Sequence, residues 1–486
     1  MTDRRGFLTG ACTLGACVLG KGAAFAAEAA SGAAKLKIGL LSDIHLEGPE
    51  SVAKLEKAFL RYRDLHVDGV LICGDLADHG IEVELKMLAD TWRKVFPDDR
   101  LPDGSHIERL FHYGDHDTGG YAHTKSFFGS GDRLMKRYGI TYEELCAQAL
   151  RGKRAEIWEK LFGEKWEPIF HKRVKGYDFI LANWTPDDSN GGNRTPGLDA
   201  FLKDFHPDPS KPFFHSQHRV YRRTAGGPAT WGQDDGTTGA LLSKHPNCLA
   251  FCGHGHLSAT DEKAIWQGAF SAIEVPSLRY VGFPGDHENK SVSDLRKKAG
   301  IPAQMGNLPV YESLQGMLMT VCDDRIVIDR LDFGATEPLG PAWTIPFDGA
   351  KRPYAPRARR RAAVAPQFPA AAEAQARKIS KKAKDGAVTA QLEVTFPLAQ
   401  PTAATPRAFD YEVTATSIQT GGTATPVLHK VYSPRAFDAP SRDPGPGRCL
   451  FSFEEFPKGV RDFHVCVVPC DAFGLRGEPI ETEVRL

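Results

Sequence analysis

Six short apolar runs, separated by longer polar segments, organise the first half of the chain. Each run spans five to eight residues, a length that suits a buried strand and is too short for a helix. The expected strands are residues 35–42, 68–73, 107–113, 177–183, 211–216 and 248–252. Because they alternate with helical or loop segments, they predict an α/β fold.

Polar side chains follow several of these strands at the point where the apolar run ends. Asp43, Asp75, Asp115 and His254 all lie at or just beyond the C-terminal end of a strand. In open α/β sheets this edge is where functional sites are built. We therefore expect the chemistry of the chain to be located there.

Two further segments complete the first expected domain, residues 35–349. Residues 121–175 are amphipathic with helical spacing, which predicts a helical insertion beside the strand ends. This insertion would serve either as a packing cap or as a lid that shapes a substrate site. Residues 314–333 predict a hairpin that turns near Asp323 and Asp324 and closes the domain.

The rest of the chain predicts a linker and a second, all-β domain. Residues 350–374 are rich in Ala, Pro and Arg, and we expect the basic run at 357–361 to be solvated rather than bound to phosphate or lipid. Residues 375–486 carry alternating runs at 388–396, 409–417, 426–432, 449–453, 463–468 and 480–484. Divided by Gly and Pro turns, these runs predict a small β-sandwich. The sequence at 467–474 resembles a fibronectin type III module.

The N-terminus departs from globular composition. Arg4 and Arg5 precede a Gly- and Ala-rich apolar run that ends in an Ala-x-Ala site at residues 24–26. This is the layout of a signal peptide spanning residues 1–26. The Arg-Arg-Gly-Phe-Leu string resembles a twin-arginine export signal, which implies a periplasmic or extracellular location. A lipoprotein-like box ending at Cys17 leaves lipid anchoring as an alternative.

Length and charge narrow the class of protein. The 486 residues exceed what a single core accommodates, which fits two domains. With 61 basic and 61 acidic residues, the chain carries no global electrostatic signal for nucleic acid. No stretch of about eighteen apolar residues predicts a transmembrane helix. Eight of the ten cysteines lie beyond the signal peptide, and we expect most of them to be buried thiols.

Five motifs carry the groups that a two-metal site needs. They are, in chain order, Asp43-Ile44-His45, Gly74-Asp75, Gly114-Asp115-His116-Asp117, His218 and Gly253-His254-Gly255-His256. Divalent metals at hydrolytic sites take carboxylate and imidazole ligands, and two metals about 3.5 to 4 Å apart need a bridging ligand. Alternation along an extended segment is expected to put Asp43 and His45 on one side, and His254 and His256 likewise.

The ordered set resembles the calcineurin-like metallophosphoesterase family, whose pattern runs Asp-x-His, Gly-Asp, Gly-Asn-His-Asp/Glu, His and Gly-His-x-His. The resemblance spans residues 36–333 and implies a four-layer α/β/β/α sandwich with two divalent metal ions, Mn, Zn or Fe. It implies a first metal held by Asp43, His45 and His256, a bridging Asp75, and a second metal held by Asp115, His218 and His254. Asp115 stands where the family usually has Asn. Its added charge is expected to tighten metal binding and to lower Lewis acidity.

The resemblance leaves choices at two positions. His215 and His218 are both candidates, and the end of the apolar strand favours His218 as the ligand, with His215 partly buried or supporting it. His116 is implied as the group that protonates the leaving oxygen. Asp117 either fixes the tautomer of His116 or raises its pKa, or it is a turn-forming residue without that role.

The activity that the resemblance implies is hydrolysis of a phosphate mono- or diester by a hydroxide that bridges the two metals. Arg219, Arg279 and Tyr280 lie close to the motifs and would either hold the phosphate of a small substrate or be ordinary loop residues. Asp78 occupies the position where purple acid phosphatases have a tyrosine ligand. A ferric tyrosinate site is therefore not expected.

Two rival functions stay open on the sequence alone. One is a metal-binding recognition protein with little or no catalysis, in which the C-terminal module contacts another protein or the cell surface. The other is a metal-dependent nuclease, which the lack of a basic groove signature makes less attractive. The intact motif set and His116 favour the hydrolase, whereas Asp115 and the appended module favour recognition.

Overall fold

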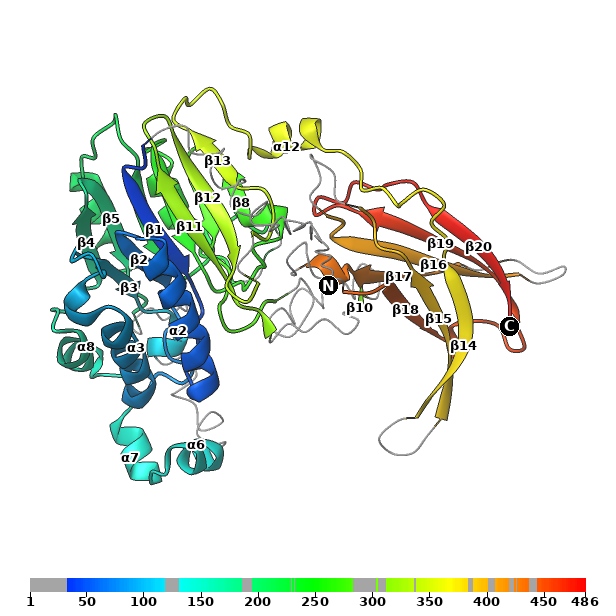
Figure 1. Ribbon diagram of the computed structural model, residues 1–486, viewed down its shortest axis with the longest axis horizontal. Helices are drawn as coiled ribbons and strands as arrows, with labels where there is room; N and C mark the ends of the chain where they lie inside the picture. The colour runs from blue at the N-terminus through cyan, green and yellow to red at the C-terminus, as the bar shows by residue number, and fades with distance from the viewer. Residues whose placement is uncertain are drawn as a thin grey trace, which may run out of the picture.

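The computed structural model describes most of the chain beyond the predicted signal peptide. The described residues are 33–118, 131–185, 195–228, 230, 232–282, 303–304, 312–335, 338–382, 388–400, 407–418, 424, 426–436 and 444–486. The signal peptide, the alternative anchor at Cys17 and the first part of the predicted insertion, residues 121–130, therefore lie outside the described residues. Figure 1 shows an α/β part followed by an all-β C-terminal part.

The first sheet of the α/β part has six strands in the order β13-β12-β11-β1-β2-β3. Strands β1, β2 and β3 run parallel, and β11 and β12 form the antiparallel hairpin predicted at residues 314–333. The bounds are β1 Leu36–Leu41, β2 Gly69–Cys73, β3 Glu108–His112, β11 Gln315–Val321, β12 Arg325–Asp332 and β13 Trp343–Pro346.

The second sheet also has six strands, in the order β4-β5-β6-β7-β9-β8. Strands β5, β6, β7 and β9 run parallel, and the two edge strands are antiparallel to their neighbours. The bounds are β4 Ile169–Val174, β5 Tyr177–Ala182, β6 Phe213–Gln217, β7 Cys248–Cys252, β8 Ile265–Gln267 and β9 Ser271–Glu274.

All six strands predicted from the apolar runs are confirmed, but the edge strand β4 contradicts one expectation. It lies within residues 121–175, where the sequence predicts helices. Only Phe170 and Val174 are buried in it, while His171 and Arg173 are exposed, because successive side chains of a strand point to opposite faces of the sheet. A strand of this kind has no continuous apolar run, so its period is easily assigned to a helix.

Helices cover the outer faces of both sheets. Figure 1 shows α2 and α3 against the first sheet, while Leu198 of α9 and Leu242 of α10 share one core with Phe213 of the second sheet. The predicted four-layer α/β/β/α sandwich is therefore confirmed. None of the described helices is long and apolar enough to cross a membrane. The bounds are α2 Pro49–Asp64, α3 Glu82–Val95, α4 Asp115–Thr118, α6 Gly131–Tyr138, α7 Tyr142–Ala147, α8 Arg154–Phe162, α9 Leu198–Asp204 and α10 Thr237–Leu242.

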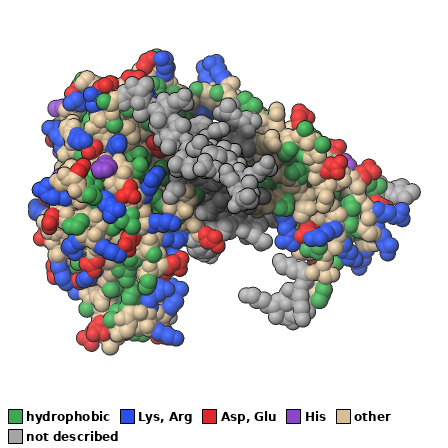
Figure 2. Space-filling model, viewed as in Figure 1, with side chains coloured by type: hydrophobic (Ala, Val, Ile, Leu, Met, Phe, Trp, Pro, Cys, Tyr) green, Lys and Arg blue, Asp and Glu red, His purple; other side chains and the backbone are tan. Residues whose placement is uncertain are grey.

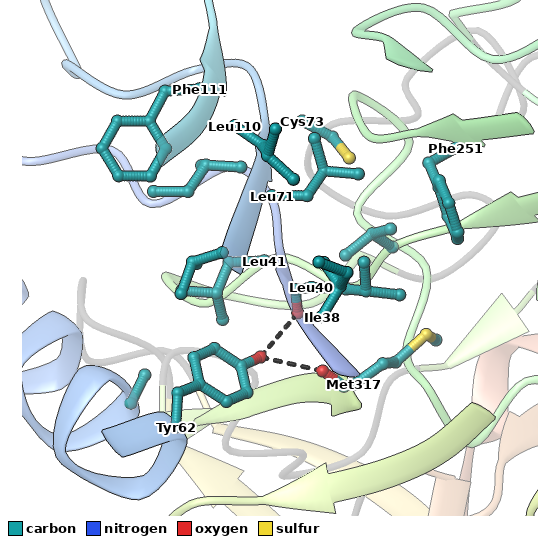
Figure 3. Close-up of a cluster of buried hydrophobic side chains, with 14 of the residues drawn as sticks. Ile38, Leu40, Leu41, Tyr62, Leu71, Cys73, Leu110, Phe111, Phe251 and Met317 are labelled. Atoms are coloured by element: carbon teal, nitrogen blue, oxygen red, sulfur yellow. Dashed lines mark hydrogen bonds between the residues drawn. The ribbon is translucent and has the colours of Figure 1, made fainter. Parts of the chain in front are cut away.

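The core between helix α2 and the first sheet fixes β1, the strand that leads into the first motif. The Tyr62 hydroxyl lies 2.8 Å from the Leu40 carbonyl oxygen and 3.0 Å from that of Met317, as Figure 3 shows. The Tyr62 ring packs on Gly39, where a Cβ atom would come within 2.6 Å of it. Tyr62 therefore ties α2 to two neighbouring strands, and only glycine fits beneath its ring.

The C-terminal part consists of two packed sheets, as the sequence predicts. One has the order β14-β15-β18 and the other β10-β17-β16-β19-β20. Their inner faces share a core that includes Leu392, Tyr411 and Val465. The bounds are β10 Ala303–Gln304, β14 Gln375–Lys382, β15 Val388–Phe396, β16 Asp410–Ile418, β17 Pro426–Tyr432, β18 Gly447–Ser452, β19 Asp462–Cys470 and β20 Ile480–Arg485.

The basic run between the two parts is solvated as predicted at Arg357, Arg360 and Arg361, which are exposed, whereas Arg359 is half-buried. Helix α12, Pro356–Ala362, carries the basic run. The Arg359 guanidinium lies 5.0 Å from the ring centre of Tyr354 and 5.1 Å from that of Phe473, and its Nη2 is 3.6 Å from a Glu262 carboxylate oxygen. Arg359 thus joins the α/β part, through the ion pair with Glu262, to the C-terminal part, through the cation–π contact with Phe473.

The surface and the cysteines agree with the expectations from composition. On the face that Figure 2 shows, basic and acidic side chains are intermingled over the α/β part rather than gathered in one patch. The eight cysteines among the described residues are all free, and six of them are buried. Burial of most of these thiols is therefore confirmed.

Candidate metal centre

The ends of five parallel strands from the two sheets converge on one site. Asp43 follows β1, Asp75 follows β2, and Asp115 opens α4 just after β3. From the second sheet, His218 follows β6 and His254 follows β7. The structure thus brings together residues that are more than 200 positions apart in sequence, with His45 and His256 beside them.

Asp43, His45 and His256 form the first cluster of the site. The His256 Nε2 atom lies 3.1 Å from Asp43 Oδ1 and 3.3 Å from His45 Nε2. All three side chains are buried. This is the set that the family resemblance implies for the first metal.

Asp115, His218 and His254 form the second cluster. Asp115 Oδ1 lies 3.1 Å from His218 Nε2 and 3.1 Å from His254 Nδ1, and these two nitrogens are 3.1 Å apart. The three polar atoms therefore form a nearly equilateral triangle. This is the set implied for the second metal.

Asp75 lies between the two clusters. Its Oδ2 atom is 3.2 Å from His218 Nε2 in the second cluster and 3.7 Å from His45 Nε2 in the first. Its Oδ1 atom accepts a 3.0 Å hydrogen bond from the His116 backbone N–H, which fixes the carboxylate. Asp75 is thus positioned to contact groups bound at both clusters.

Hydrogen bonds on the outer side of the imidazoles set their tautomers. His218 Nδ1 lies 2.7 Å from the Cys73 carbonyl oxygen, and His256 Nδ1 lies 3.1 Å from that of Tyr280. A carbonyl oxygen only accepts, so Nδ1 carries the hydrogen in both rings. The Nε2 lone pairs of His218 and His256 therefore point into the site, as a metal requires.

The side chains of the site are carboxylates and imidazoles, which are suited to bind cations. Asp115 Oδ1 is buried and faces the His218 and His254 nitrogens at 3.1 Å each, without a well-aligned hydrogen bond to either. Three carboxylates and several imidazole nitrogens face one another at 3 to 4 Å, an arrangement that is costly unless positive charge, from ring protons or from bound cations, lies between them. Although burial alone would raise the pKa of Asp43, His256 and His218 hold it well below its usual range. Asp43 is therefore ionised and suited to bind a divalent metal.

The backbone at the site corrects the expectation of extended alternation. Five of the seven predicted ligands have positive φ, namely Asp43 at 48°, His45 at 40°, Asp75 at 52°, His254 at 70° and His256 at 54°. Left-handed conformations cost about 1–3 kcal/mol each in such residues and are concentrated at functional sites. The ligands converge because the chain turns at each of them, not because they alternate along a strand.

Two glycines of the motifs let the ligands approach one another. Gly74 has φ +87°, and a Cβ atom there would come within 2.5 Å of His218 Nδ1. A Cβ atom on Gly114 would come within 2.2 Å of Asp75 Oδ1. Both motifs therefore need glycine for the space that the neighbouring ligand occupies.

His116 lies beside the two clusters and is partly open to solvent. Its Nδ1 donates to the Asp78 carbonyl oxygen at 2.7 Å, and its Nε2 lies 4.0 Å from Asp75 Oδ2. Burial lowers the pKa of His116, but the carboxylates of Asp75, Asp115 and Asp78 outweigh this and raise it to about 9. An imidazole with Nε2 aimed at the centre can donate a proton there.

The carboxylate of Asp117 contacts backbone N–H groups of two neighbouring loops. Its carboxylate accepts hydrogen bonds from the backbone N–H groups of Leu76, Ala77 and Gly114 at 2.7 to 3.1 Å. The group that receives the Nδ1 hydrogen of His116 is a backbone carbonyl instead. Asp117 therefore holds the loops that carry Asp75 and Asp115, and the tautomer of His116 does not depend on its carboxylate.

The other sequence candidates separate into those near the centre and those held elsewhere. His215 is buried with Nδ1 2.7 Å from the Tyr221 hydroxyl, so His218 is the histidine that joins the cluster. Arg279 is engaged by Glu47 and by Glu50, whose Oε1 is 3.2 Å away, rather than presented to a phosphate.

Two aromatic rings flank the centre. The Tyr280 ring lies 4.3 Å from that of His256, on the side of the first cluster. The Trp184 ring lies 5.8 Å from that of His254, on the side of the second cluster, and the Arg219 guanidinium lies 4.7 Å from the Trp184 ring centre. Of the three predicted substrate residues, Arg219 and Tyr280 thus border the centre.

Comparison with known proteins identifies the α/β part. Residues 36–258 match the family described as calcineurin-like phosphoesterase. No curated protein matches the chain in sequence.

The solved structures that match the chain share little sequence with it. One is a dimetal phosphatase from Danio rerio, at 12% identity and a TM-score of 0.36, over 65% of this chain and 100% of that one. Another is GAP50, the anchor in the inner membrane complex of Plasmodium, at 11% identity and a TM-score of 0.35, over 64% of this chain and 88% of that one.

Proposed function

We propose that the calcineurin-like phosphoesterase domain of this chain hydrolyses a phosphate mono- or diester with two divalent metal ions. The observation that carries the proposal is the position of Asp75, whose Oδ2 reaches His218 Nε2 at 3.2 Å and His45 Nε2 at 3.7 Å. One carboxylate shared by two Asp/His clusters is the arrangement that a dinuclear hydrolytic site needs. The buried Asp115 Oδ1 supports it.

The roles of the residues follow from their positions. Asp43, His45 and His256 would hold the first metal, Asp115, His218 and His254 the second, and Asp75 both. When bound, the two cations would polarise the phosphoryl oxygens and lower the pKa of the attacking water. His116 would donate the proton on Nε2 to the leaving oxygen, while the Asp78 carbonyl keeps the hydrogen on its Nδ1.

Asp115 in place of the family's Asn keeps the geometry of the second cluster. The Oδ1 atom that faces His218 and His254 at 3.1 Å is present in either residue. The additional charge of Asp favours retention of a cation and weakens its pull on substrate electrons. We therefore propose tight metal binding with a modest cost in rate.

Arg219 is the substrate-binding arginine in this proposal. Its guanidinium is held over the Trp184 ring beside the second cluster, whereas Arg279 is engaged by two glutamates. Arg219→Ala is expected to raise KM for an aryl phosphate about 10- to 100-fold, the effect of losing a charge-assisted hydrogen bond. Steady-state kinetics measure this. Arg223→Ala, an exposed arginine of the same loop, is the control and should leave KM unchanged.

Export and the nature of the C-terminal part belong to the same proposal. We propose that residues 1–26 direct export, on the strength of the Arg4-Arg5 motif and the Ala-x-Ala site. The C-terminal part, with sheets β14-β15-β18 and β17-β16-β19-β20, supports a fibronectin type III-like module. Contact of this module with a protein or the cell surface stays a prediction.

The proposal is tested by loading the metal-free chain with Mn²⁺ or Zn²⁺ and assaying p-nitrophenyl phosphate and bis-p-nitrophenyl phosphate. Turnover of either ester that disappears on chelation and returns with metal supports it. Binding of about two metals per chain without turnover of either ester would favour the recognition protein instead.

A further inference from the structure

Asp78 contacts both the first cluster and His116 from the outer side of the site. Its Oδ1 atom lies 3.1 Å from His45 Nδ1, the nitrogen that faces away from His256. Its carbonyl oxygen accepts the His116 Nδ1–H at 2.7 Å. One residue therefore orients a predicted metal ligand through its side chain and the proton donor through its backbone.

A buried chain of polar groups holds Asp78 in turn. Asp78 Oδ2 lies 3.3 Å from His79 Nε2, and His79 Nδ1 lies 2.7 Å from Glu84 Oε1 on helix α3. Glu84 Oε2 also accepts the His79 backbone N–H at 2.7 Å. His79 is 4% exposed and Glu84 is fully buried, so water competes little for these bonds.

The chain of polar groups ends on the helical insertion. The Tyr138 hydroxyl, on helix α6, lies 2.7 Å from Glu84 Oε1 and 3.0 Å from the Glu47 carbonyl oxygen. Helix α6 also packs through Leu134 onto Ile81, two residues beyond His79. The insertion is thus joined to the metal centre by the series Tyr138, Glu84, His79, Asp78 and His45.

Direct metal binding by Asp78 is the main rival explanation. Its carboxylate lies with His45 and His116 in one group of potential ligands. However, Oδ1 faces His45 Nδ1, whereas His45 Nε2 is the atom that lies within 4 Å of Asp43 and Asp75. The imidazole ring therefore stands between Asp78 and the centre, which is the place of a supporting carboxylate.

We propose that Asp78 is a positioning residue that fixes His45 for metal binding, and that His79, Glu84 and Tyr138 tie its position to helix α6. The inference rests on the proposed two-metal function. Carboxylates that support a ligating histidine change metal affinity or activity about 10- to 100-fold when removed. Through these contacts the helical insertion would help to hold His45 of the first cluster in place.

The first test is metal titration of Asp78→Ala and Asp78→Asn, starting from metal-free protein and following Mn²⁺ binding calorimetrically. Asp78→Ala is expected to weaken one of two sites about 10- to 100-fold. Asp78→Asn should recover most of the affinity, because an amide oxygen still accepts the His45 Nδ1–H and the backbone carbonyl is unchanged. Circular dichroism and thermal melting of the metal-free variants check that they fold.

The second test removes only the hydrogen bond between the Tyr138 hydroxyl and Glu84. Tyr138→Phe is expected to weaken the same site about fivefold, the fold-change of one net hydrogen bond. Tyr142→Phe, on the neighbouring helix α7 and 51% exposed, is the matched control and should bind as wild type does.

Each outcome separates the positioning role from the proposed function. Wild-type affinity in Asp78→Ala would overturn the positioning role, and loss of one metal in both Asp78 variants would make Asp78 a ligand itself. Equal binding by Tyr138→Phe and Tyr142→Phe would overturn the link to helix α6. Failure of the wild-type chain to bind two metals would instead refute the proposed function on which the inference rests.

Discussion

Asp75→Asn is expected to remove the carboxylate that the two metals would share and to lower kcat about 10³-fold. The substitution removes the negative charge and puts an NH₂ group in the place of Oδ2, the atom between the clusters. The remaining amide oxygen can still accept the His116 N–H. Charge stabilisation by the metals is worth several kcal/mol, and about 4 kcal/mol corresponds to that factor. Phosphatase assays of the metal-loaded variant, with its metal content measured in parallel, provide the check.

A matched control exists for this variant. Asp98 has the same φ of 52° as Asp75 but is exposed and remote from the clusters, so Asp98→Asn changes charge at an equivalent backbone conformation. Asn adopts this conformation at least as readily as Asp, so neither variant should misfold. Activity of Asp75→Asn within about tenfold of wild type would show that no shared carboxylate is needed.

His116→Ala is expected to lower kcat about 10²- to 10⁴-fold while leaving metal content unchanged. The side chain borders the clusters without belonging to either, and its Nε2 lies 4.0 Å from Asp75 Oδ2. Loss of a general acid costs this range of rate. The loss should be larger for phenyl phosphate than for p-nitrophenyl phosphate, because p-nitrophenolate leaves with less need of a proton.

The dependence on the leaving group distinguishes proton donation from a structural role of His116. His106→Ala removes a histidine whose side chain is 61% exposed and should have no effect on either substrate. An equal loss of rate for phenyl and p-nitrophenyl phosphate would show that His116 does not donate the proton.

The sequence predicts the strands and the motifs because both are local. Each of the six apolar runs is a buried strand, and the polar residues at the ends of the strands meet where parallel strands share an edge. The strand ends alone predict Asp43, Asp75, Asp115 and His254, whereas the full set of seven ligands comes from the family resemblance. The edge strand β4 is missed because its alternating, half-exposed pattern lacks an apolar run.

The backbone conformation of the ligands and the contacts that hold nearby side chains are not predicted, because they involve residues far apart in the sequence. Asp43 and His45 have positive φ, and Asp43 accepts a 3.1 Å hydrogen bond from the His254 N–H of the second sheet. Arg279 is engaged by Glu47 and Glu50, more than 200 residues earlier in the chain. No sequence spacing reveals such pairs.

Asp117 shows how a short spacing can mislead. Its place next to His116 suggests a pair, but adjacent residues on the turn of α4 point in different directions. The carboxylate instead meets the backbone of Leu76 and Ala77, some forty residues away. The Nδ1 atom of His116 is instead supported by the Asp78 carbonyl oxygen.

The central claim is that two metals occupy this site and share Asp75. Anomalous scattering from crystals loaded with Mn²⁺ or Zn²⁺ tests it most directly. We predict two peaks about 3.5 to 4 Å apart, one next to His45 and His256, the other next to His218 and His254, with Asp75 in contact with both. A single peak, or two peaks of which only one contacts Asp75, would contradict the account.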